Sequence, residues 1–327
     1  MSATYRAMLC RRVGSPETLE LAILPRRPLL PSEVRIAVRA AGVNFPDLLQ
    51  VAGKYQHKPP LPFVPGFEAA GEIIELAADV PGWKTGDAVL LRGTAAYAEE
   101  MVAPASALRP KPADWSWDEA AAFPVAASTA WVALLPRGRL QAGETLLVLG
   151  AGGGTGLAAV SLGADCGARV VAVASSPEKR AAAQAAGADI CLDPAVSGWD
   201  QAVQADLVFD PVGGVLFATA WKALRPGGRW LVIGFAGGTI PNLPANRLLL
   251  KEAELIGVRA GEQGRRNPAA AQALDAGLRG WLAGSASVGR ERRRPLIGAV
   301  YRLDEAAAAL RQLADRKAVG KLVLHTR

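Results

Sequence analysis

Short apolar runs recur at regular spacing through the middle of the chain, and helix-like or turn-rich segments separate them. The runs cover residues 145–149, 169–173, 189–192, 206–209, 229–233 and 254–258. Each has the length and the branched side chains of a strand that is buried on both faces. Six such strands alternating with helices predict an α/β architecture, a doubly wound six-stranded parallel sheet that places its ligand at the carboxyl ends of the strands.

The first third of the chain has a different pattern. Its short strands, such as residues 34–39 and 72–76, are separated by turns rich in proline and glycine. This pattern predicts a small, distorted, all-β barrel. From Asp114 the pattern turns helical, which puts a domain boundary near residue 123.

The end of the chain predicts a further helix and a closing unit. The helix covers residues 268–283, and the closing unit consists of a strand at 299–303, a helix at 304–316 and a strand at 321–324. We expect these last strands to return to the first domain.

A glycine-rich turn follows the first of the six apolar runs and leads into a helical pattern. Ala151, Gly153 and Gly156 occupy the three positions of Gly-x-Gly-x-x-Gly, with alanine in place of the first glycine. Such a turn lets the backbone approach a pyrophosphate, whose charge the helix N-terminus stabilises. The prediction is a dinucleotide site that also includes Gly154 and Thr155. The simpler alternative is a tight turn between two core elements.

The residues after the second apolar run bear on which dinucleotide binds. An NAD-dependent enzyme usually places a carboxylate here, on the ribose hydroxyls, whereas this chain has Ser175 followed by Ser176. With Lys179 and Arg180 one turn further on, these hydroxyls suit a 2′-phosphate, so NADPH is favoured over NADH. Alternatively, Ser176 only caps a helix that begins at Pro177, and the two cations are solvated.

Two further glycine-containing loops follow later strands of the predicted sheet. Residues 210–214 and 234–238 are at the carboxyl ends of their strands, where the ribose and nicotinamide of a dinucleotide are expected. We therefore add Gly234, Phe235 and Ala236 to the predicted cofactor site, although both loops can also be ordinary strand-to-helix turns.

Composition excludes several classes of protein. The chain has 327 residues, a formal net charge of +7 and scattered arginines, and we interpret the clusters at 265–266 and 290–294 as solvated connections. No basic face interleaved with aromatic residues indicates nucleic-acid binding. Residues 145–164 carry no charge, but their glycines would weaken a membrane-spanning helix at its middle. Without a signal-peptide pattern, and with only three widely spaced cysteines, we expect a cytoplasmic protein.

Motifs along nearly the whole chain carry a family resemblance. They are residues 40–47 (AAGVNFPD), 53–55 (GKY), 62–68 (PFVPGFE), 151–156, 174–180 (ASSPEKR), 210–214 (DPVGG) and 320–324 (GKLVL). The sequence resembles the zinc-independent quinone oxidoreductases, the zeta-crystallin-like branch of the medium-chain dehydrogenase/reductases. The resemblance implies a GroES-like catalytic domain from residues 1–122 and 264–327, a Rossmann NADPH-binding domain from 123–263, a cleft between them, and a homodimer. Thr129, near the start of the nucleotide domain, is also assigned to the cofactor site.

The zinc-using members of the superfamily differ at two positions. They have cysteine where this chain has Asn44, and Gly-His-Glu where it has Gly66-Phe67-Glu68. With both ligands absent, no metal is expected, and a zinc alcohol dehydrogenase is a weak alternative. Glu68 then needs a partner near the core, for which Lys321 or an arginine is our expectation.

Without zinc, hydride is expected to pass from NADPH to a quinone or another electron-poor α,β-unsaturated carbonyl. The Asn44 amide and the Tyr55 hydroxyl are candidates to stabilise the oxygen that gains negative charge. Tyr55 resembles the proton donor of 2-enoyl thioester reductases, which makes that activity an alternative. Tyr55 can equally pack at the mouth of the cleft, and Asn44 can position the cofactor. Asp47 is a third catalytic candidate, with a loop-holding hydrogen bond as the competing role.

Two positions depart from the family pattern. Pro194 and Leu49 stand where some quinone reductases have tyrosines, against the adenosine phosphate and in the substrate pocket respectively. The substrate preferences of those enzymes therefore do not transfer to this chain. A nucleotide-binding protein with little catalysis is a further alternative that the fold permits.

Overall fold

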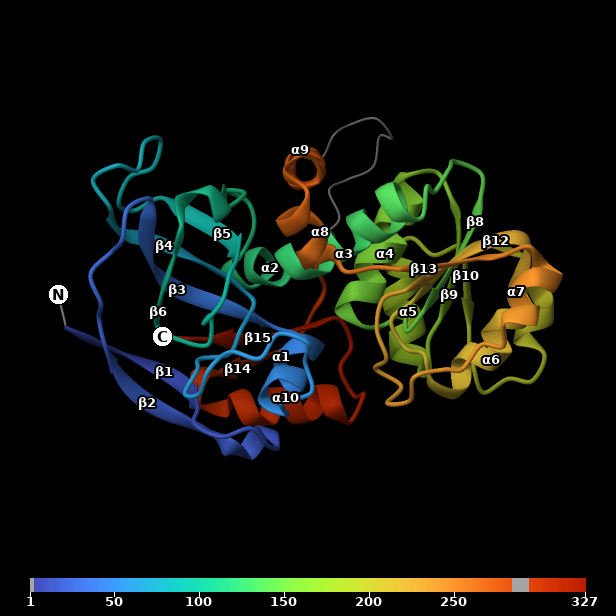
Figure 1. Cartoon of the computed structure of the whole chain (residues 1–327), viewed down its shortest axis with the longest axis horizontal. Coiled ribbons are helices and arrows are strands. Elements are labelled where there is room, and N and C mark those ends of the chain that lie inside the picture. Colours follow the sequence, from blue (N-terminus) through green and yellow to red (C-terminus); the bar gives the residue numbers. More distant parts are fainter. Residues whose placement is uncertain (1–2, 284–293) are drawn as a thin grey trace. The chain divides into compact units, whose positions relative to one another are not determined.

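A computed structural model describes residues 3–283 and 294–327, which form two compact units (Figure 1). The first unit contains Met1–Val125 and Ile297–Arg327, and the second contains Ala126–Leu296. The arginine cluster at 290–293 lies outside the described residues.

The second unit is built around one parallel six-stranded sheet. Its strand order is β10-β9-β8-β11-β12-β13, and every neighbouring pair is parallel. The strands are β8 (Thr145–Leu149), β9 (Arg169–Val173), β10 (Ile190–Leu192), β11 (Ala205–Asp210), β12 (Leu224–Val232) and β13 (Glu254–Gly257). All six predicted strands are confirmed, and the order reverses direction between β8 and β11, the point at which a doubly wound sheet binds its ligand.

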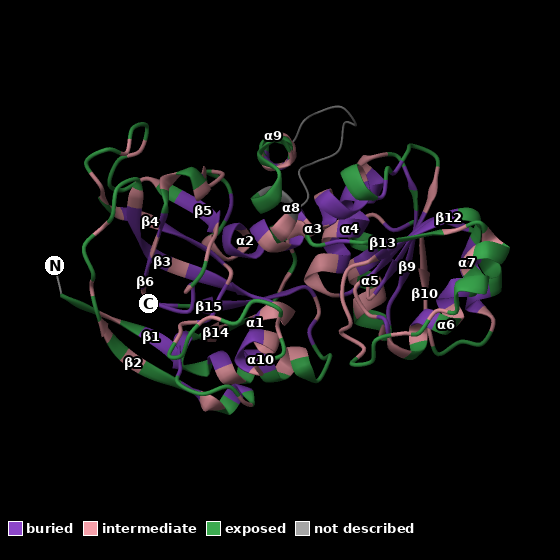
Figure 2. Ribbon diagram, viewed as in Figure 1, coloured by how far each residue is buried: buried purple, intermediate pink, exposed green. Residues whose placement is uncertain are grey.

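The helices between these strands are α4 (Gly154–Asp165), α5 (Pro177–Ala185), α6 (Gly214–Ala223) and α7 (Ala245–Lys251), with a 3-10 segment at η4 (Trp199–Ala202). Helix α3 (Pro124–Val132) and the π-helical segment η3 (Ala133–Arg137) precede the sheet, and α8 (Ala260–Arg266) and α9 (Pro268–Leu282) follow it. Figure 2 shows the central strands buried and α7 exposed. The core includes an aromatic group in which the Phe217 and Trp230 ring centroids lie 4.6 Å apart.

Helix α9 lies in the second unit, although we assigned residues from 264 onward to the first domain. Within that unit α9 packs against α8 and also approaches α3. A Cβ atom on Gly277 would lie 2.2 Å from Nε1 of Trp131, so the approach at this point requires glycine.

The uncharged stretch at 145–164 is confirmed as a strand, a turn and a helix, namely β8 and α4. Another helical stretch in the described part of the chain, Trp117–Arg137, is long and apolar enough to cross a membrane by length and composition. Because 67% of its most apolar window is buried inside the protein, it has the character of a core helix.

The first unit contains a seven-stranded sheet with the order β14-β15-β3-β4-β5-β7, in which β6 pairs with β3. Its strands are β3 (Glu33–Val43), β4 (Glu68–Leu76), β5 (Ala88–Arg92), β6 (Glu100–Pro104), β7 (Leu108–Pro110), β14 (Ile297–Arg302) and β15 (Lys321–His325), and β1 (Thr4–Cys10) pairs with β2 (Leu19–Pro25). The predicted return of the C-terminal strands is confirmed, because β15 runs antiparallel to β3 with Leu322 opposite Val43.

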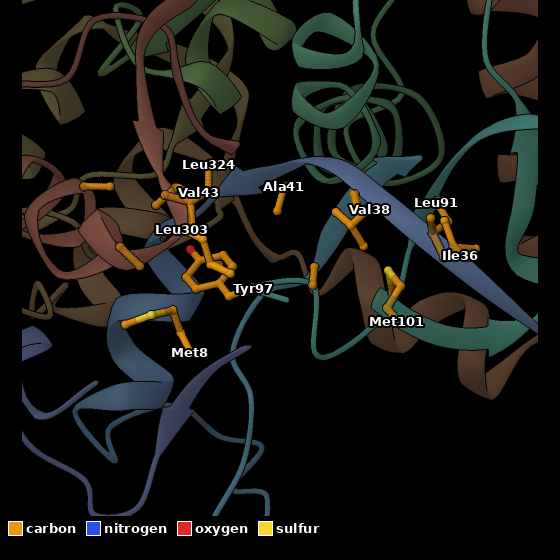
Figure 3. Packing of buried hydrophobic residues seen from close by; sticks show 14 of the residues in the cluster. Met8, Ile36, Val38, Ala41, Val43, Leu91, Tyr97, Met101, Leu303 and Leu324 are labelled. Carbon is orange, nitrogen blue, oxygen red and sulfur yellow. The ribbon is translucent and has the colours of Figure 1, made fainter. Parts of the chain in front are cut away.

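Helical elements also occur in the first unit. Helices α2 (Trp117–Ala122) and α10 (Ala306–Ala314) confirm the helical patterns predicted from Asp114 and at 304–316, and the single turn η5 (Leu303–Glu305) precedes α10. The first third is not all-β, because it also contains α1 (Phe45–Val51) and the single turns η1 (Pro16–Thr18) and η2 (Ala105–Ala107). The first turn of α1 contains Pro46 and Asp47. Both residue types favour the start of a helix at these positions. Figure 3 shows the core of this unit, where residues of β3 such as Ile36 and Val38 pack with Met101 and Tyr97.

Candidate active site

The glycine-rich turn of the second unit has the backbone geometry that a pyrophosphate site requires. Strand β8 leads into Gly150, whose φ is +64°, and α4 begins at Gly154 with Gly153 as its N-cap. A Cβ atom on Gly156 would lie 2.4 Å from the carbonyl oxygen of Gly150, so only glycine fits there. Gly153 offers no side chain to cap α4, which leaves the first N–H groups of the helix to an anionic ligand.

Lys179 lies directly against this turn. A Cβ atom on Gly152 would be 2.4 Å from Cβ of Lys179, so the side chain packs over the glycine. Burial lowers the pKa of the Lys179 ammonium, because desolvation disfavours the charged form. An anion bound at the turn would offset that penalty.

The two serines after β9 have different surroundings. Ser175 is exposed, whereas the Ser176 hydroxyl accepts a hydrogen bond of 3.3 Å from the backbone N–H of Lys179 and caps α5. The capping role that the sequence left open for Ser176 is therefore confirmed. It leaves Ser175 as the serine available to a ligand.

Arg180 is engaged by the protein itself. Its Nη1 donates to Oδ2 of Asp193 and to the carbonyl oxygen of Ala174, both at 2.9 Å. Asp193, in the segment after β10, therefore neutralises part of the basic pocket predicted from the sequence, and nothing local in the sequence indicated this pair.

The loops that follow β11 and β12 hold each other in place. The backbone N–H of Ala236 donates to the carbonyl of Pro211 at 3.1 Å, and that of Gly237 donates to the carbonyl of Val212 at 2.7 Å. The Asp210 carboxylate accepts the N–H groups of Val212 and Gly213, both at 2.8 Å. Burial raises the pKa of Asp210 despite these bonds.

The same loops lie beside the glycine turn. A Cβ atom on Gly150 would be 2.8 Å from Cγ2 of Val212. The carboxyl edge of the sheet therefore brings the glycine turn together with the loop that carries Gly234, Phe235 and Ala236. Thr129, which is half-buried on α3, belongs to the same unit.

In the first unit, Glu68 at the start of β4 is wholly buried and paired with Lys321 of β15. Lys321 Nζ donates to Glu68 Oε1 at 2.6 Å and to Asn44 Oδ1 at 2.7 Å. Asn44 Nδ2 donates to the same Glu68 oxygen at 2.9 Å, and the other carboxylate oxygen accepts the N–H of Val125 at 2.6 Å. The expectation that Lys321 is the partner of Glu68 is confirmed. Both the oxygen and the nitrogen of the Asn44 side-chain amide therefore make hydrogen bonds within this network.

Asp47 lies next to this network and is also wholly buried. Its Oδ2 accepts the N–H of Asn44 at 2.7 Å and the hydroxyl of Tyr97 at 2.9 Å, whereas Oδ1 has no hydrogen-bond partner. Burial raises the pKa of Asp47 to about 7. These bonds are the loop-holding interactions that the sequence left open for Asp47, and they give it no exposed surface from which to act on a substrate.

Tyr97 was missed by sequence reasoning. It comes from the segment between β5 and β6, is fully buried, and has a pKa raised well above its usual value by burial and by the neighbouring Asp47 carboxylate. One tyrosine among short strands carries no pattern, so only the folded chain pairs it with Asp47.

Tyr55 follows α1 and is half-buried. Its backbone N–H donates to the carbonyl of Leu49 in α1 at 3.1 Å. Its ring lies 5.8 Å from the ring of Phe67, centroid to centroid, at an interplanar angle of 54°. Tyr55 is therefore attached to α1 by its backbone and to the segment before β4 by its side chain.

Similarity to known families covers both units. A family described as zinc-binding dehydrogenase matches residues 154–276, and one described as the alcohol dehydrogenase GroES-like domain matches residues 30–113. The quinone oxidoreductase-like protein 2 of Bos taurus is 38% identical over 330 residues, which covers 98% of this chain and 92% of that protein. The chain belongs to the quinone oxidoreductase family of the medium-chain dehydrogenase/reductases.

Solved structures of this family agree with the fold. The quinone oxidoreductase of Thermus thermophilus, solved also in complex with NADPH, is 33% identical with a TM-score of 0.82, and the match covers 98% of this chain and 100% of that one. A mycobacterial protein complexed with NADPH is 27% identical with a TM-score of 0.88 and the same coverage. The predicted combination of a GroES-like domain and a six-stranded Rossmann domain is confirmed.

The name of one matching family raises the question of whether this oxidoreductase can hold zinc. Protein ligands of zinc are Cys, His, Asp and Glu. At the positions in question, Phe67 has no donor atom, the Asn44 amide is engaged, and Glu68 is neutralised by Lys321. Elsewhere among residues 3–283 and 294–327, no three His, Cys, Asp or Glu side chains are grouped so as to hold a metal. The donor atoms at these positions therefore do not form a zinc site.

Proposed function

We propose that this protein is an NADPH-dependent oxidoreductase that reduces quinones or other electron-poor α,β-unsaturated carbonyl compounds without zinc. The closed network of Glu68, Lys321 and Asn44 carries the proposal. An ammonium group supplies the positive charge that a buried carboxylate needs, so no metal is required beside Glu68. That network separates metal-free hydride transfer from the zinc alcohol dehydrogenase alternative.

The second unit supports NADPH as the cofactor. The N-terminus of α4 and the tight turn at Ala151, Gly153, Gly154, Thr155 and Gly156 would hold the pyrophosphate. Ser175 and Lys179 would bind the 2′-phosphate through charge-assisted hydrogen bonds, next to a helix that Ser176 caps. We propose that Thr129, Gly234, Phe235 and Ala236 position the nicotinamide end. When bound, NADPH supplies the hydride.

The residues of the first unit would act on the acceptor. We propose that the Tyr55 hydroxyl donates a hydrogen bond or a proton to the oxygen that gains charge, an effect worth about 10² to 10⁴ in rate where a true acid is present. We propose supporting roles for Asn44 and Asp47. Both atoms of the Asn44 amide are engaged in hydrogen bonds, and Asp47 is wholly buried and holds the start of α1 through its Oδ2.

A panel of acceptors tests the proposal. Benzoquinone, a phenanthrene-type quinone, an alkenal and an enoyl-CoA are each assayed with NADPH and with NADH, before and after treatment with a chelator. We expect oxidation of NADPH that the chelator does not reduce, and a higher kcat/KM for NADPH than for NADH. Stoichiometric zinc in the purified protein, or activity lost with the chelator, would contradict the metal-free mechanism.

A second candidate is reduction of a 2-enoyl thioester, with Tyr55 as proton donor. The observation that favours it is the half-buried position of Tyr55 outside the hydrophobic core. Tyr55→Phe removes the hydroxyl and keeps the ring that packs on Phe67. A loss of turnover with enoyl-CoA but not with quinones would select this candidate, and intact turnover of every acceptor would remove Tyr55 from the catalytic residues.

We propose further that the protein acts as a homodimer in the cytoplasm. Strand β13 is the last strand of its sheet, and its Leu255 is exposed, as are Leu249 and Leu250 of the preceding α7. Apolar side chains near a sheet edge favour association with a second copy. All three cysteines are free thiols, as expected in a reducing compartment. Light scattering of the wild type and of Leu255→Glu tests the dimer: a monomeric wild type would contradict it.

A further inference from the structure

Tyr97 is an unusual residue for the position it occupies. It is completely buried in the core of the first unit, where Figure 3 shows it among apolar side chains. A buried phenol needs a hydrogen-bond partner, and the Tyr97 hydroxyl finds it in Asp47 Oδ2 at 2.9 Å. The core therefore contains a polar contact directed at the first turn of α1.

That contact bears on the position of Tyr55 through α1. Asp47 Oδ2 also accepts the N–H of Asn44, the residue before the helix, so the carboxylate closes the start of α1. At the other end of the helix, the N–H groups of Lys54 and Tyr55 both donate to the carbonyl of Leu49, at 2.8 and 3.1 Å. A shift of α1 is therefore transmitted to Tyr55 by backbone hydrogen bonds.

The ring of Tyr97 lies against the segment that carries Phe67, the aromatic neighbour of Tyr55. Gly66 has a φ of +104°, and a Cβ atom on it would lie 2.6 Å from Cδ1 of Tyr97. The Tyr97 N–H also donates to the carbonyl of Pro65 at 3.0 Å. The next residue after Gly66, Phe67, packs its ring on that of Tyr55. Tyr97 thus contacts both segments that hold Tyr55, α1 through Asp47 and the segment before Phe67 through its ring.

We propose that Tyr97 is a positioning residue for Tyr55, with its hydroxyl holding α1 through Asp47 and its ring supporting the segment before Phe67. The proposal rests on the proposed function, in which the Tyr55 hydroxyl acts on the acceptor. It assigns Tyr97 no contact with substrate or cofactor.

The titration of Asp47 provides a pH dependence of activity by which the positioning role of Tyr97 can be tested. The groups that face it are the Tyr97 hydroxyl, the Asn44 N–H, the Lys321 ammonium and the Glu68 carboxylate. The Tyr97 hydroxyl lowers the pKa of Asp47, opposing the rise that burial causes. As a carboxylate, Asp47 accepts the Asn44 N–H more strongly than as a neutral acid. Activity is therefore expected to fall as pH decreases through the pKa of Asp47.

The variant Tyr97→Phe keeps the ring and removes the hydroxyl. We expect kcat to fall about 10-fold to 100-fold, the range associated with a misplaced catalytic group, with the Kd for NADPH unchanged. The acid limb of the pH–kcat profile should move to higher pH, because Asp47 loses a bond that lowers its pKa. The double variant Tyr97→Phe/Tyr55→Phe should be no slower than Tyr55→Phe, since the hydroxyl that Tyr97 positions is already gone.

The matched control is Tyr301→Phe. Tyr301 is half-buried in the first unit, and its hydroxyl donates to the neutral Gln312. This variant also loses one hydroxyl hydrogen bond, yet the acid limb should stay where it is in the wild type. A shift of equal size in Tyr301→Phe would overturn the specific role of Tyr97.

Two other results would overturn the proposal: an unchanged pH profile in Tyr97→Phe, or an equal fold-loss when Tyr97→Phe is added to the wild type and to Tyr55→Phe. Should Tyr97→Phe fail to fold, Asp47→Asn carries the test, because it removes the titrating group and must abolish the acid limb. The proposed function fails separately, if the wild type reduces no acceptor of the panel. Full turnover in Tyr55→Phe would remove the catalytic role of Tyr55, and with it the positioning role of Tyr97, but not the reductase activity.

Discussion

The buried pair of Glu68 and Lys321 allows the metal-free interpretation of the site to be tested by a single substitution. In Lys321→Met the side chain keeps roughly its volume, but the ammonium is lost. Glu68 then loses its 2.6 Å partner while it is still wholly buried, and Asn44 Oδ1 loses its 2.7 Å donor. The carboxylate has no solvent to compensate, so its charge is left unpaired in the core.

Removing one partner of a buried ion pair typically costs about 3 to 5 kcal/mol. Lys321 is 5% exposed and Glu68 is 0% exposed, so solvent screening does not reduce the effect. Because each 1.4 kcal/mol is a tenfold change in an equilibrium constant, we expect opening of the surrounding strands to become about 10² to 10⁴ times more frequent.

Hydrogen exchange followed by mass spectrometry measures this opening. Strands β3 and β15 are hydrogen-bonded to each other and carry the network, so their amides should exchange faster. Strand β8 of the second unit is the internal control, where exchange should not change. Lys321→Met/Glu68→Gln should recover most of the protection, since both charges are removed.

Two results would refute the reasoning. Unchanged exchange at β3 and β15 in Lys321→Met would mean that the pair does not stabilise this sheet. Recovery of the variant on addition of zinc would mean that Glu68 lies in a competent metal site, and the metal-free mechanism would then be wrong.

Three further predictions follow from other contacts. Gly156→Ala places a Cβ against the Gly150 carbonyl, so the Kd for NADPH measured by fluorescence titration should rise at least about tenfold, whereas Gly280→Ala, with open space around it, should leave it unchanged. Asp193→Asn keeps the oxygen that accepts the Ala195 N–H but weakens the ion pair with Arg180. Arg180 is then freer to bind a 2′-phosphate, so the ratio of kcat/KM for NADPH to that for NADH should rise about 3-fold to 10-fold. An unchanged ratio would show that Arg180 cannot reach the 2′-phosphate. Asp47 has a folded-state pKa of about 7 against 3.8 as its ordinary value, so the folded protein retains a proton that the unfolded chain releases. Its contribution therefore lowers the free energy of unfolding by up to about 1.4 kcal/mol per unit as pH rises from about 4 to 7; urea titrations should show this slope in the wild type relative to Asp47→Asn, and parallel curves for the two proteins would contradict it.

The sequence alone determined those features whose cause is local. Each strand of the Rossmann sheet contains a short apolar run, although β12 begins at Leu224, before its run, and the turn after β8 needs glycine because backbone atoms meet there. Both signals are contained within about ten residues. Helix α1 was missed because it is short and lies between strands, so the proline and glycine pattern around it dominated the prediction.

Only the tertiary structure decided which polar groups meet. Glu68 and Lys321 are 253 positions apart, and Asp47 and Tyr97 are 50 apart. Nothing near either carboxylate in the sequence identifies its partner with certainty, because a buried charge accepts any donor that the packing of strands brings within reach. The pairing of β15 with β3 brings Lys321 to Glu68, and the segment between β5 and β6 brings Tyr97 to Asp47. The hydrogen-bond network of the first unit thus depends on contacts between distant segments, whereas the glycine turn after β8 is specified by neighbouring residues.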